Sequence, residues 1–513
     1  MHDGMGRRRF IGMSAGTLIA AGAGDLLSGC ATVGSRPGAP GQGIGYFGRF
    51  GVTEAVIAEA LGAAPSRGGD HADVFFQHRV AHDLVLEDGS VNRAHAGVEL
   101  GVGVRVVKGD QTGYGYTEDL SLEAILDAAR TAAVIADGAA REAPARLHLE
   151  PRPAGRYAPR TPWEDAGAKT KLPLLEQVNA RLLAADPSVR KVNVYLHDES
   201  GAVLVADSSG RVVEDLQPMT LLAASVLAER DGRREQNGYN IAGRAGVELY
   251  TPERVDRLVK GAWERTAILF ESGQPPAGEM PVVLAAGSSG ILLHEAIGHG
   301  MEADFNRKGV SIYADKMGKP VAAPFVSIVD DGTEPGARGS IHVDDEGNSA
   351  GRTVLVENGV LASYLHDSIS ARHYQVAPTG NGRRESYRYP PLPRMRSTYM
   401  LPGPHDRDEI LRSVKRGIYC QTFSNGQVQI GAGDFTFFVK NGWLIEDGKL
   451  TRPIKDVNLI GNGPKVLEKV DMVSNDLAID EGGWTCGKDG QSVPVSQGLP
   501  TVRVSSMTVG GRG

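Results

Sequence analysis

The chain of 513 residues has few cysteines and no excess of basic residues. Its three cysteines, Cys30, Cys420 and Cys486, form no CxxC pair, which excludes a disulfide scaffold and a zinc ribbon. Lysine and arginine number 55 against 62 acidic residues, so the net charge of −7 leaves no basic footprint for nucleic acid. We therefore expect no nucleic-acid partner.

Long hydrophobic runs are also missing. The apolar run at residues 10–23 is too short and too rich in glycine and alanine for a stable transmembrane helix, and no later stretch reaches spanning length. The run contains the end of a twin-arginine pattern, Arg7-Arg8-Arg9-Phe10-Ile11. Leu27-Ser28-Gly29-Cys30 then fits a bacterial lipoprotein cleavage box.

These N-terminal features predict a protein exported by the twin-arginine route to the periplasm or cell envelope. We expect lipid attachment at Cys30, so that the mature chain contacts a membrane through an N-terminal anchor at most. A plain cleavable signal with a chance cysteine is the alternative.

The composition and the turn signals predict an α+β fold in two domains. Glycine is abundant, with 67 residues, which favours β-rich structure with many turns and bulges. We expect a signal at 1–30, a flexible Gly/Pro/Ser-rich tether at 31–47, an N-terminal α+β domain at 48–275 and a β-rich C-terminal domain at 276–513. The boundary is the segment Ser-Gly-Gln-Pro-Pro-Ala-Gly at 272–278.

In the first half, hydrophobic periodicity predicts an antiparallel sheet with helices packed on one face. The expected strands lie within 72–107 and at 191–196, 203–206 and 219–227, and the expected helices at 52–61, 121–136, 170–185 and 252–269. The second half reads as mostly strand, with helix only near 406–415. Hairpin turns are expected at Asp88-Gly89, Asn358-Gly359, Asn441-Gly442 and Asp447-Gly448.

The stretch His294-Glu295-Ala296-Ile297-Gly298-His299 follows the expected buried strand at 280–286 and carries the candidate chemistry. Imidazoles bind zinc well, and a neighbouring carboxylate can take a proton from metal-activated water. Histidines five apart lie roughly 140° apart on a regular helix, so both reach one metal only if the helix is distorted near Gly298. A third ligand could come from Glu302, Asp304 or the distant Cys486, and residue types alone do not choose among them.

Residues 292–309 resemble the HExxxH signature of the TldD/PmbA family of metalloproteases, and Cys486-Gly487-Lys488-Asp489-Gly490-Gln491 is similar to its C-terminal cysteine loop. The early block around 85–89 and 101–105 is similar to the family's N-terminal domain. The resemblance implies Zn²⁺ held by His294, His299 and Cys486, with Glu295 as general base. It further implies a TldD-like, metal-bearing subunit that cleaves small unfolded peptides in an enclosed chamber, as a homodimer or with a PmbA/TldE-like partner.

Several alternatives accompany this hypothesis. A Cys420–Cys486 disulfide would remove the third ligand, and a catalytically silent peptide-binding or scaffolding lipoprotein with a structural zinc site would need no general base. An oxyanion or peptide contact could come from His366, Arg394, Arg396 or the glycine loop at Gly431. Solvated surface charge is the preferred interpretation of Arg394 and Arg396, as it is of Arg383 and Arg384.

Overall fold

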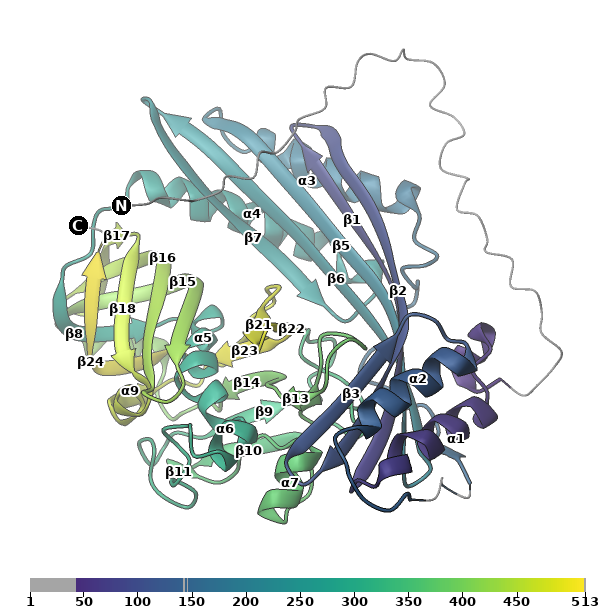
Figure 1. The fold of residues 1–513 in the computed structure, drawn as a ribbon. Coiled ribbons are helices and arrows are strands. Elements are labelled where there is room, and N and C mark those ends of the chain that lie inside the picture. Colours follow the sequence, from purple (N-terminus) through teal and green to yellow (C-terminus); the bar gives the residue numbers. More distant parts are fainter. Residues whose placement is uncertain (1–42, 142–143, 145, 512–513) are drawn as a thin grey trace, which may run out of the picture. The chain divides into compact units, whose positions relative to one another are not determined.

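The computed structural model describes residues 43–141, 144 and 146–511. In its N-terminal part, long strands form one sheet in the order β3-β2-β1-β5-β6-β4, with β7 also paired to β6 (Figure 1). All its pairings are antiparallel except that of β4 with β6. The strands are β1 (His71–Glu87), β2 (Ser90–Lys108), β3 (Gln111–Thr117), β4 (His148–Leu149), β5 (Val189–Asp207), β6 (Arg211–Arg230) and β7 (Arg233–Gly243).

Four helices cover one face of this sheet, as predicted. They are α1 (Glu54–Ala63), α2 (Leu122–Ala133), α3 (Ala168–Leu183) and α4 (Pro252–Ala267). The side chains of Thr53, Ser121 and Thr251 cap α1, α2 and α4 by accepting a backbone N–H. Even-numbered residues of β5, including Val194 and Leu204, are buried beneath the helices, because alternate residues of a strand share a face.

The helix-free face of the sheet packs against the C-terminal part of the chain. Tyr387 is fully buried there in a cluster with Phe75, Val203 and Val205. Gly101 makes this approach possible, because a Cβ at that position would lie 2.3 Å from the Tyr387 ring. The phenol of Tyr114 also donates a hydrogen bond to the Tyr387 carbonyl at 2.7 Å.

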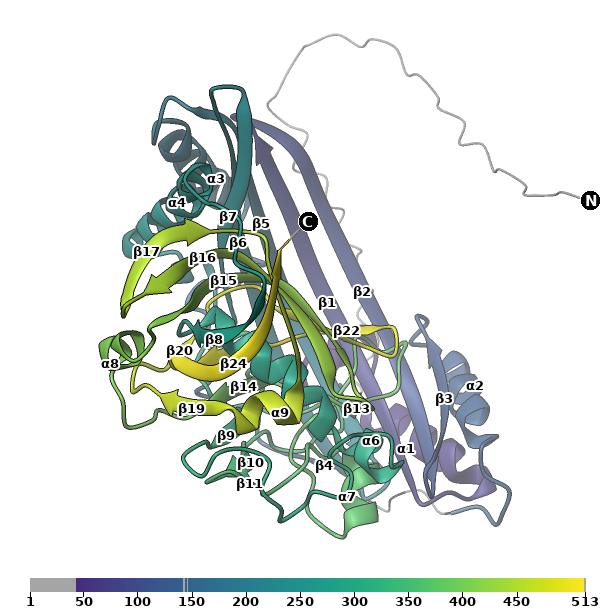
Figure 2. The same ribbon diagram turned by 90° about the vertical axis from the view of Figure 1, so that its left-hand side faces the viewer.

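The C-terminal part is built around a sheet that closes on itself. Its order is β15-β8-β24-β18-β16-β17, and β15 also pairs with β16, so five of its strands form a ring (Figures 1 and 2). β19 joins it by pairing with β24. The strands are β8 (Gly278–Leu284), β15 (Arg416–Gln429), β16 (Asp434–Glu446), β17 (Lys449–Ile454), β18 (Val457–Asn462), β19 (Val470–Val473) and β24 (Val502–Gly511).

A second C-terminal sheet and two short hairpins complete the strands. The second sheet has the order β11-β10-β9-β14-β23-β20, and β12 pairs with β13 and β21 with β22. Their bounds are β9 (Ile328–Asp331), β10 (Arg352–Glu357), β11 (Val360–Leu361), β12 (Gly382–Arg383), β13 (Leu392–Pro393), β14 (Ser397–Met400), β20 (Ala478–Ile479), β21 (Thr485–Lys488), β22 (Gln491–Pro494) and β23 (Ser496–Leu499).

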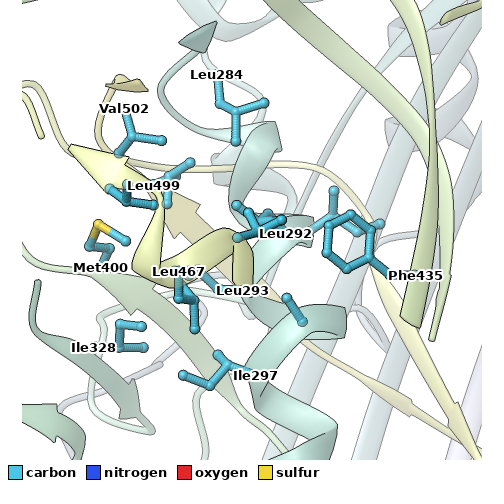
Figure 3. Close-up of a cluster of buried hydrophobic side chains, with 14 of the residues drawn as sticks. Leu284, Leu292, Leu293, Ile297, Ile328, Met400, Phe435, Leu467, Leu499 and Val502 are labelled. Atoms are coloured by element: carbon cyan, nitrogen blue, oxygen red, sulfur yellow. The ribbon is translucent and has the colours of Figure 1, made fainter. Parts of the chain in front are cut away.

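A hydrophobic core joins the two C-terminal sheets around a short helix, α5 (Ile291–Leu293) (Figure 3). Leu292 and Leu293 of α5 belong to one buried cluster with Leu284 of the ring and Met400 of the second sheet. The other short helices of this part are α6 (Ala303–Arg307), α7 (Ser368–Tyr374), α8 (Arg407–Arg412) and α9 (Gly463–Glu468). Only α8 falls where the sequence predicted helix.

Three of the four predicted hairpin turns are present and one is wrong. At Asp88-Gly89, Asn358-Gly359 and Asp447-Gly448 both residues have positive φ, as two-residue hairpins require. Asn441-Gly442 instead lies inside β16. There the Asn441 carboxamide oxygen accepts a hydrogen bond from Thr422, and Gly442 allows the Tyr419 carbonyl to approach.

The structure describes only part of the N-terminal region for which the sequence makes predictions. The signal, Cys30 and residues 31–42 of the expected tether lie outside the described residues. The tether does not extend to residue 47, because Gly45–Phe50 forms a 3-10 helix and Phe47 is completely buried. Among the described residues, no helix is both long and apolar enough to cross a membrane.

Candidate metal centre

The first candidate histidine begins a distorted helical turn. Strand β8 leads through α5 into a π-helical turn, His294–Gly298, in which the N–H of His299 donates to the carbonyl of His294. This five-residue hydrogen-bond interval brings residues five apart back to one side of the helix. The two imidazole rings lie 5.0 Å apart between centroids. The predicted helix distortion is confirmed.

A hairpin far along the chain brings Cys486 to the two histidines. Cys486 lies on β21, which pairs with β22 through a turn at Asp489-Gly490. Its Sγ is 3.5 Å from His299 Nε2, and the donor atoms of His294, His299 and Cys486 all lie within 4.8 Å of one another. All three side chains are buried. The structure therefore gathers the three residues that the resemblance implies.

Electrostatics favours the thiolate form of Cys486. Burial by itself would raise the pKa of this thiol, but the charges of His294 and His299 outweigh burial and hold it well below 9.0. The nearby ammonium group of Lys488 is directed to Asp304 at 2.7 Å and Glu302 at 3.2 Å. A thiolate is the form of cysteine that binds a metal.

The donor set fits a zinc ion. Bond lengths of about 2.0–2.3 Å in a tetrahedral site place ligand atoms about 3.5 Å apart, as Sγ and Nε2 are here. The Nδ1 atom of His294 is buried with no hydrogen-bond partner in the described structure. Across the described part of the chain, the cluster contains three donor side chains and no fourth, which suits a site with one open position.

The nearby carboxylates support the histidines and do not join the cluster. Glu302 Oε2 lies 3.0 Å from His299 Nδ1, the ring nitrogen on the far side from Cys486. Burial would raise the pKa of Glu302, but Lys488 and His299 lower it to about 2. A charged carboxylate in this position fixes the orientation of a ligating imidazole. Neither Glu302 nor Asp304 thus serves as a third ligand here.

Cys420 takes no part in the metal centre, either as a disulfide partner or as a donor. Cys420 and Cys486 are both free thiols in the structure, so the Cys420–Cys486 disulfide is wrong. Cys420 lies in the core of β15, paired with Leu284 of β8. Burial raises its thiol pKa, and it is not part of the donor cluster.

A cavity of about 490 Å³ opens over the three donors. Glu295 lines it together with Trp484 and residues 426–428 of β15. A Cβ on Gly426 would lie 3.2 Å from the Cγ of Glu295, so the carboxylate arm passes directly beside this strand. The cavity thus places the candidate base, the donor cluster and a strand backbone around one space.

The predicted substrate contacts lie elsewhere. His366 is buried outside this cavity, and burial lowers its pKa to about 4. Arg394 and Arg396 are 0% exposed, so solvated surface charge is wrong for both. Arg394 donates to the Cys486 carbonyl at 2.6 Å, and Arg396 pairs with Asp330 at 2.9 Å.

Two further expectations differ from the structure. Gly431 is exposed and does not line the cavity, although the preceding Ile430 does. Arg383 and Arg384 are 3% and 5% exposed, so they too are not solvated surface charge. No local sequence pattern indicates that Arg394 supports the cysteine strand, because Arg394 and Cys486 are 92 positions apart.

Comparisons with known proteins agree with this geometry. The chain matches the models of the PmbA/TldA metallopeptidase domain 1 at 72–136, the central domain at 161–269 and the C-terminal domain at 277–511. It is 40% identical over 453 residues to the metalloprotease TldD homolog of Haemophilus influenzae, covering 87% of this chain and 94% of that protein. The zinc metalloprotease TldD homolog of Saccharolobus solfataricus is 26% identical, covering 87% and 98%.

A solved structure shares the fold. TldE from Thermococcus kodakarensis superposes with a TM-score of 0.70 at 17% identity, covering 89% of this chain and 99% of that one. The three domain models together match residues from 72 to 511 with short gaps between them. The chain belongs to the PmbA/TldD family of metallopeptidases.

Proposed function

We propose that this protein is a zinc-dependent peptidase that hydrolyses small unfolded peptides, with Glu295 as general base. The observation that carries the proposal is the convergence of His294, His299 and Cys486 in the cavity that Glu295 also lines. The relatives named metalloproteases, one of them a zinc metalloprotease, support it.

Each side chain has a role that follows from its position. His294, His299 and Cys486 would hold Zn²⁺, and Glu302 and Lys488 keep His299 oriented. When bound, the ion would supply Lewis acidity, lowering the pKa of a water at its open position and polarising a peptide carbonyl. The Glu295 carboxylate accepts the proton of the attacking water and delivers it to the leaving amine.

The backbone of β15 offers a place for an extended peptide. β16 pairs with one edge of β15 along its length, whereas β8 pairs with the other edge only at residues 418–420. Within the described chain, this second edge has no strand partner from residue 421 to Gln429. Residues 426–428 of this open edge line the cavity beside Glu295. A peptide that adds as a strand gains main-chain hydrogen bonds and needs few side-chain contacts, which suits unfolded substrates.

A second cavity extends this space. It has a volume of about 750 Å³, is lined by Phe423 and Asn425 of β15, and shares Trp484 with the metal cavity. An extended peptide lying along β15 would pass from one cavity into the other. We therefore infer that the bound peptide extends beyond the two residues that the cleaved bond joins.

The assembly and location of the protein are also proposals. We infer a homodimer or a pair with a TldE-like subunit, supported by the common fold with TldE. We infer export by the twin-arginine route, supported by the residues at 7–11, with lipid attachment at Cys30. Native mass measurement tests the first inference, and mass spectrometry of the mature N-terminus tests the second.

Glu295→Gln tests the chemistry directly. The variant should retain zinc but cleave an unstructured peptide about 10²–10⁴-fold more slowly, because an amide does not accept the water proton. Glu357→Gln on β10 removes an exposed carboxylate and is the matched control, with unchanged rate expected. Undiminished cleavage by Glu295→Gln would refute the general-base assignment, and zinc held by a wild-type protein without peptidase activity would favour the silent peptide-binding alternative.

A further inference from the structure

A separate cavity of about 440 Å³ lies between the helix-free face of the N-terminal sheet and the C-terminal part of the chain. The sheet contributes side chains from β1, β2, β5 and β6, and the C-terminal part contributes residues near 338–345, 383–385 and 485–494. Thr485 lines both this cavity and the metal cavity. The hairpin that carries Cys486 therefore stands between the two spaces.

Three arginines of this cavity lack an acidic partner. Within the described residues, no ion pair joins Arg244, Arg338 or Arg383 to a carboxylate, although Arg244 and Arg383 are only 4% and 3% exposed. Their hydrogen bonds go to neutral oxygens. Arg244 donates to the Arg338 carbonyl at 3.2 Å, Arg338 to the Trp484 carbonyl at 3.0 Å, and Arg383 to the Pro494 carbonyl at 2.8 Å.

The carboxylates that line the cavity have other partners. Glu99 and Glu199 both pair with Arg79. The cavity contains two further arginines, and both have acidic partners. Arg79 pairs with these two glutamates, and Arg384 lies 3.5 Å from Asp73.

The remaining two acids of the cavity bind the backbone. Asp345 accepts the N–H of Arg384 at 2.7 Å, and Glu385 accepts the N–H of Ser492 at 2.6 Å. Burial raises the pKa of Asp345, which favours its neutral form. Within the described residues these carboxylates form no ion pair with the three guanidinium groups, although the charges of Glu199 and Asp345 act on Arg338 and Arg383.

The positive charges of Arg244, Arg338 and Arg383 lie close together, and this proximity is electrostatically unfavourable. Burial and the nearby charge of Arg244 lower the pKa of Arg338 to about 10 and that of Arg383 to about 9. Nη1 of Arg338 is also buried with no acceptor among the described residues. Guanidinium groups form short, paired hydrogen bonds with planar or tetrahedral oxyanions, and such bonds are strongest where water is partly excluded.

We propose that this cavity binds a small oxyanion through Arg244, Arg338 and Arg383. The chemistry is shared by inorganic phosphate and by the carboxylate at the C-terminus of a short peptide, and either would neutralise the three guanidinium groups. The site does not depend on the metal or on the proposed peptidase activity. Because Arg338 and Arg383 also bind the carbonyls of Trp484 and Pro494 at the base of the β21–β22 hairpin, the anion would lie beside the hairpin that carries Cys486.

Calorimetric titration of the full chain tests the site with three probes. They are inorganic phosphate, acetyl-trialanine with a free carboxylate, and the same peptide with an amidated C-terminus. We expect phosphate or the free-acid peptide to bind and the amide to bind at least about tenfold more weakly than the free acid if the carboxylate is the ligand. The stronger of the first two probes identifies the source of the oxyanion.

Arginine variants then locate the binding. Arg244→Gln and Arg338→Gln should each weaken binding of the oxyanion at least about tenfold. Arg130→Gln, at an exposed arginine outside the cavity that pairs with Asp127, should leave binding unchanged. Circular dichroism at the titration temperature confirms that the variants are folded. The proposal is overturned if neither oxyanion binds the wild-type chain, or if binding survives both arginine substitutions in folded protein, as binding at the metal centre would.

Discussion

At the scale of single residues, the metal centre depends on side chains outside its three donors. Glu302 is fully buried behind His299, with Lys488 at 3.2 Å and Arg394 at 3.9 Å. A buried carboxylate paired in this way holds the imidazole in one orientation and increases its basicity. The metal centre therefore includes Glu302 and its cationic partners as well as the three donors.

Glu302→Gln tests this support. The amide keeps the size of the side chain but loses the charge that orients His299, so we expect zinc affinity to fall about 10–100-fold. Competition with a chelator measures the affinity without reference to activity. Glu334→Gln, at a glutamate outside the metal cavity, is the control. Equal affinity in Glu302→Gln and wild type would show that Glu302 has no positioning role.

His366 makes a prediction about pH. Burial lowers its folded-state pKa to about 4, below the usual value of 6.5, so the unfolded chain takes up the proton first as the pH falls. The folded state should lose about 2–3 kcal/mol of stability from this group between about pH 6.5 and 4. In His366→Phe that loss should be absent, as denaturant unfolding at pH 7 and pH 4.5 would show. A pH dependence identical to wild type would contradict it.

Residue chemistry predicted the donors better than it predicted the arginines. His294, Glu295 and His299 are close in sequence, so their spacing alone indicated a distorted turn. Cys486 could be chosen over Glu302 and Asp304 only through resemblance, because 187 residues separate it from His299. The burial of Arg394 and Arg396 could not be predicted, since their partners come from strands distant in sequence.

At the scale of elements, the π-helical turn is held in place by α9. A Cβ on Gly463, the first residue of α9, would lie 2.1 Å from the carbonyl oxygen of Ala296 in the turn. Only glycine allows the helix start to pack this closely against the backbone between the two histidines. The geometry of the donors therefore depends on an element from a remote part of the chain.

Gly463→Ala should disturb both stability and metal binding. Relief of the clash requires backbone movement, so we expect a loss of about 1–3 kcal/mol in the free energy of unfolding together with weaker zinc binding. Gly351→Ala is the control, because nothing lies within 4 Å of a Cβ there. Thermal unfolding and chelator competition measure the two effects. Wild-type values for both in Gly463→Ala would show that the turn is independent of α9.

Local sequence signals located most long elements but missed pairing. Capped and amphipathic segments predicted α1 to α4 within a few residues, because those helices form from one continuous pattern. Asn441-Gly442 has the composition of a turn, yet tertiary contacts with Thr422 and Tyr419 keep it inside β16. The short helices α6, α7 and α9 carry too few turns for a periodic signal.

At the scale of the whole molecule, Tyr387 joins the N-terminal sheet to the C-terminal part. Its backbone N–H donates to Gln77 at 3.1 Å, and its fully buried ring packs on Phe75. The buried pair of Arg105 with Glu346 at 2.7 Å bridges the same two parts. Closure of the five-stranded ring and this junction arise from contacts distant in sequence, which periodicity cannot indicate.

Tyr387→Ala measures how tightly the two parts are joined. Loss of a buried aromatic ring should lower the free energy of unfolding by about 3–5 kcal/mol. Phe325→Ala, at a residue 40% exposed, should change it little. Denaturant unfolding followed by tryptophan fluorescence gives both values. A loss below that of the Phe325 control would show that the junction contributes little to stability.

The most direct test of the whole account is the metal content of the purified protein. Elemental analysis should find one zinc per chain in the wild type, retained in Glu295→Gln and in the control Cys420→Ala, because neither Glu295 nor Cys420 belongs to the donor cluster. Cys486→Ser should lose the zinc, since a hydroxyl does not replace a thiolate ligand. Zinc content unchanged in folded Cys486→Ser protein would contradict the centre described here.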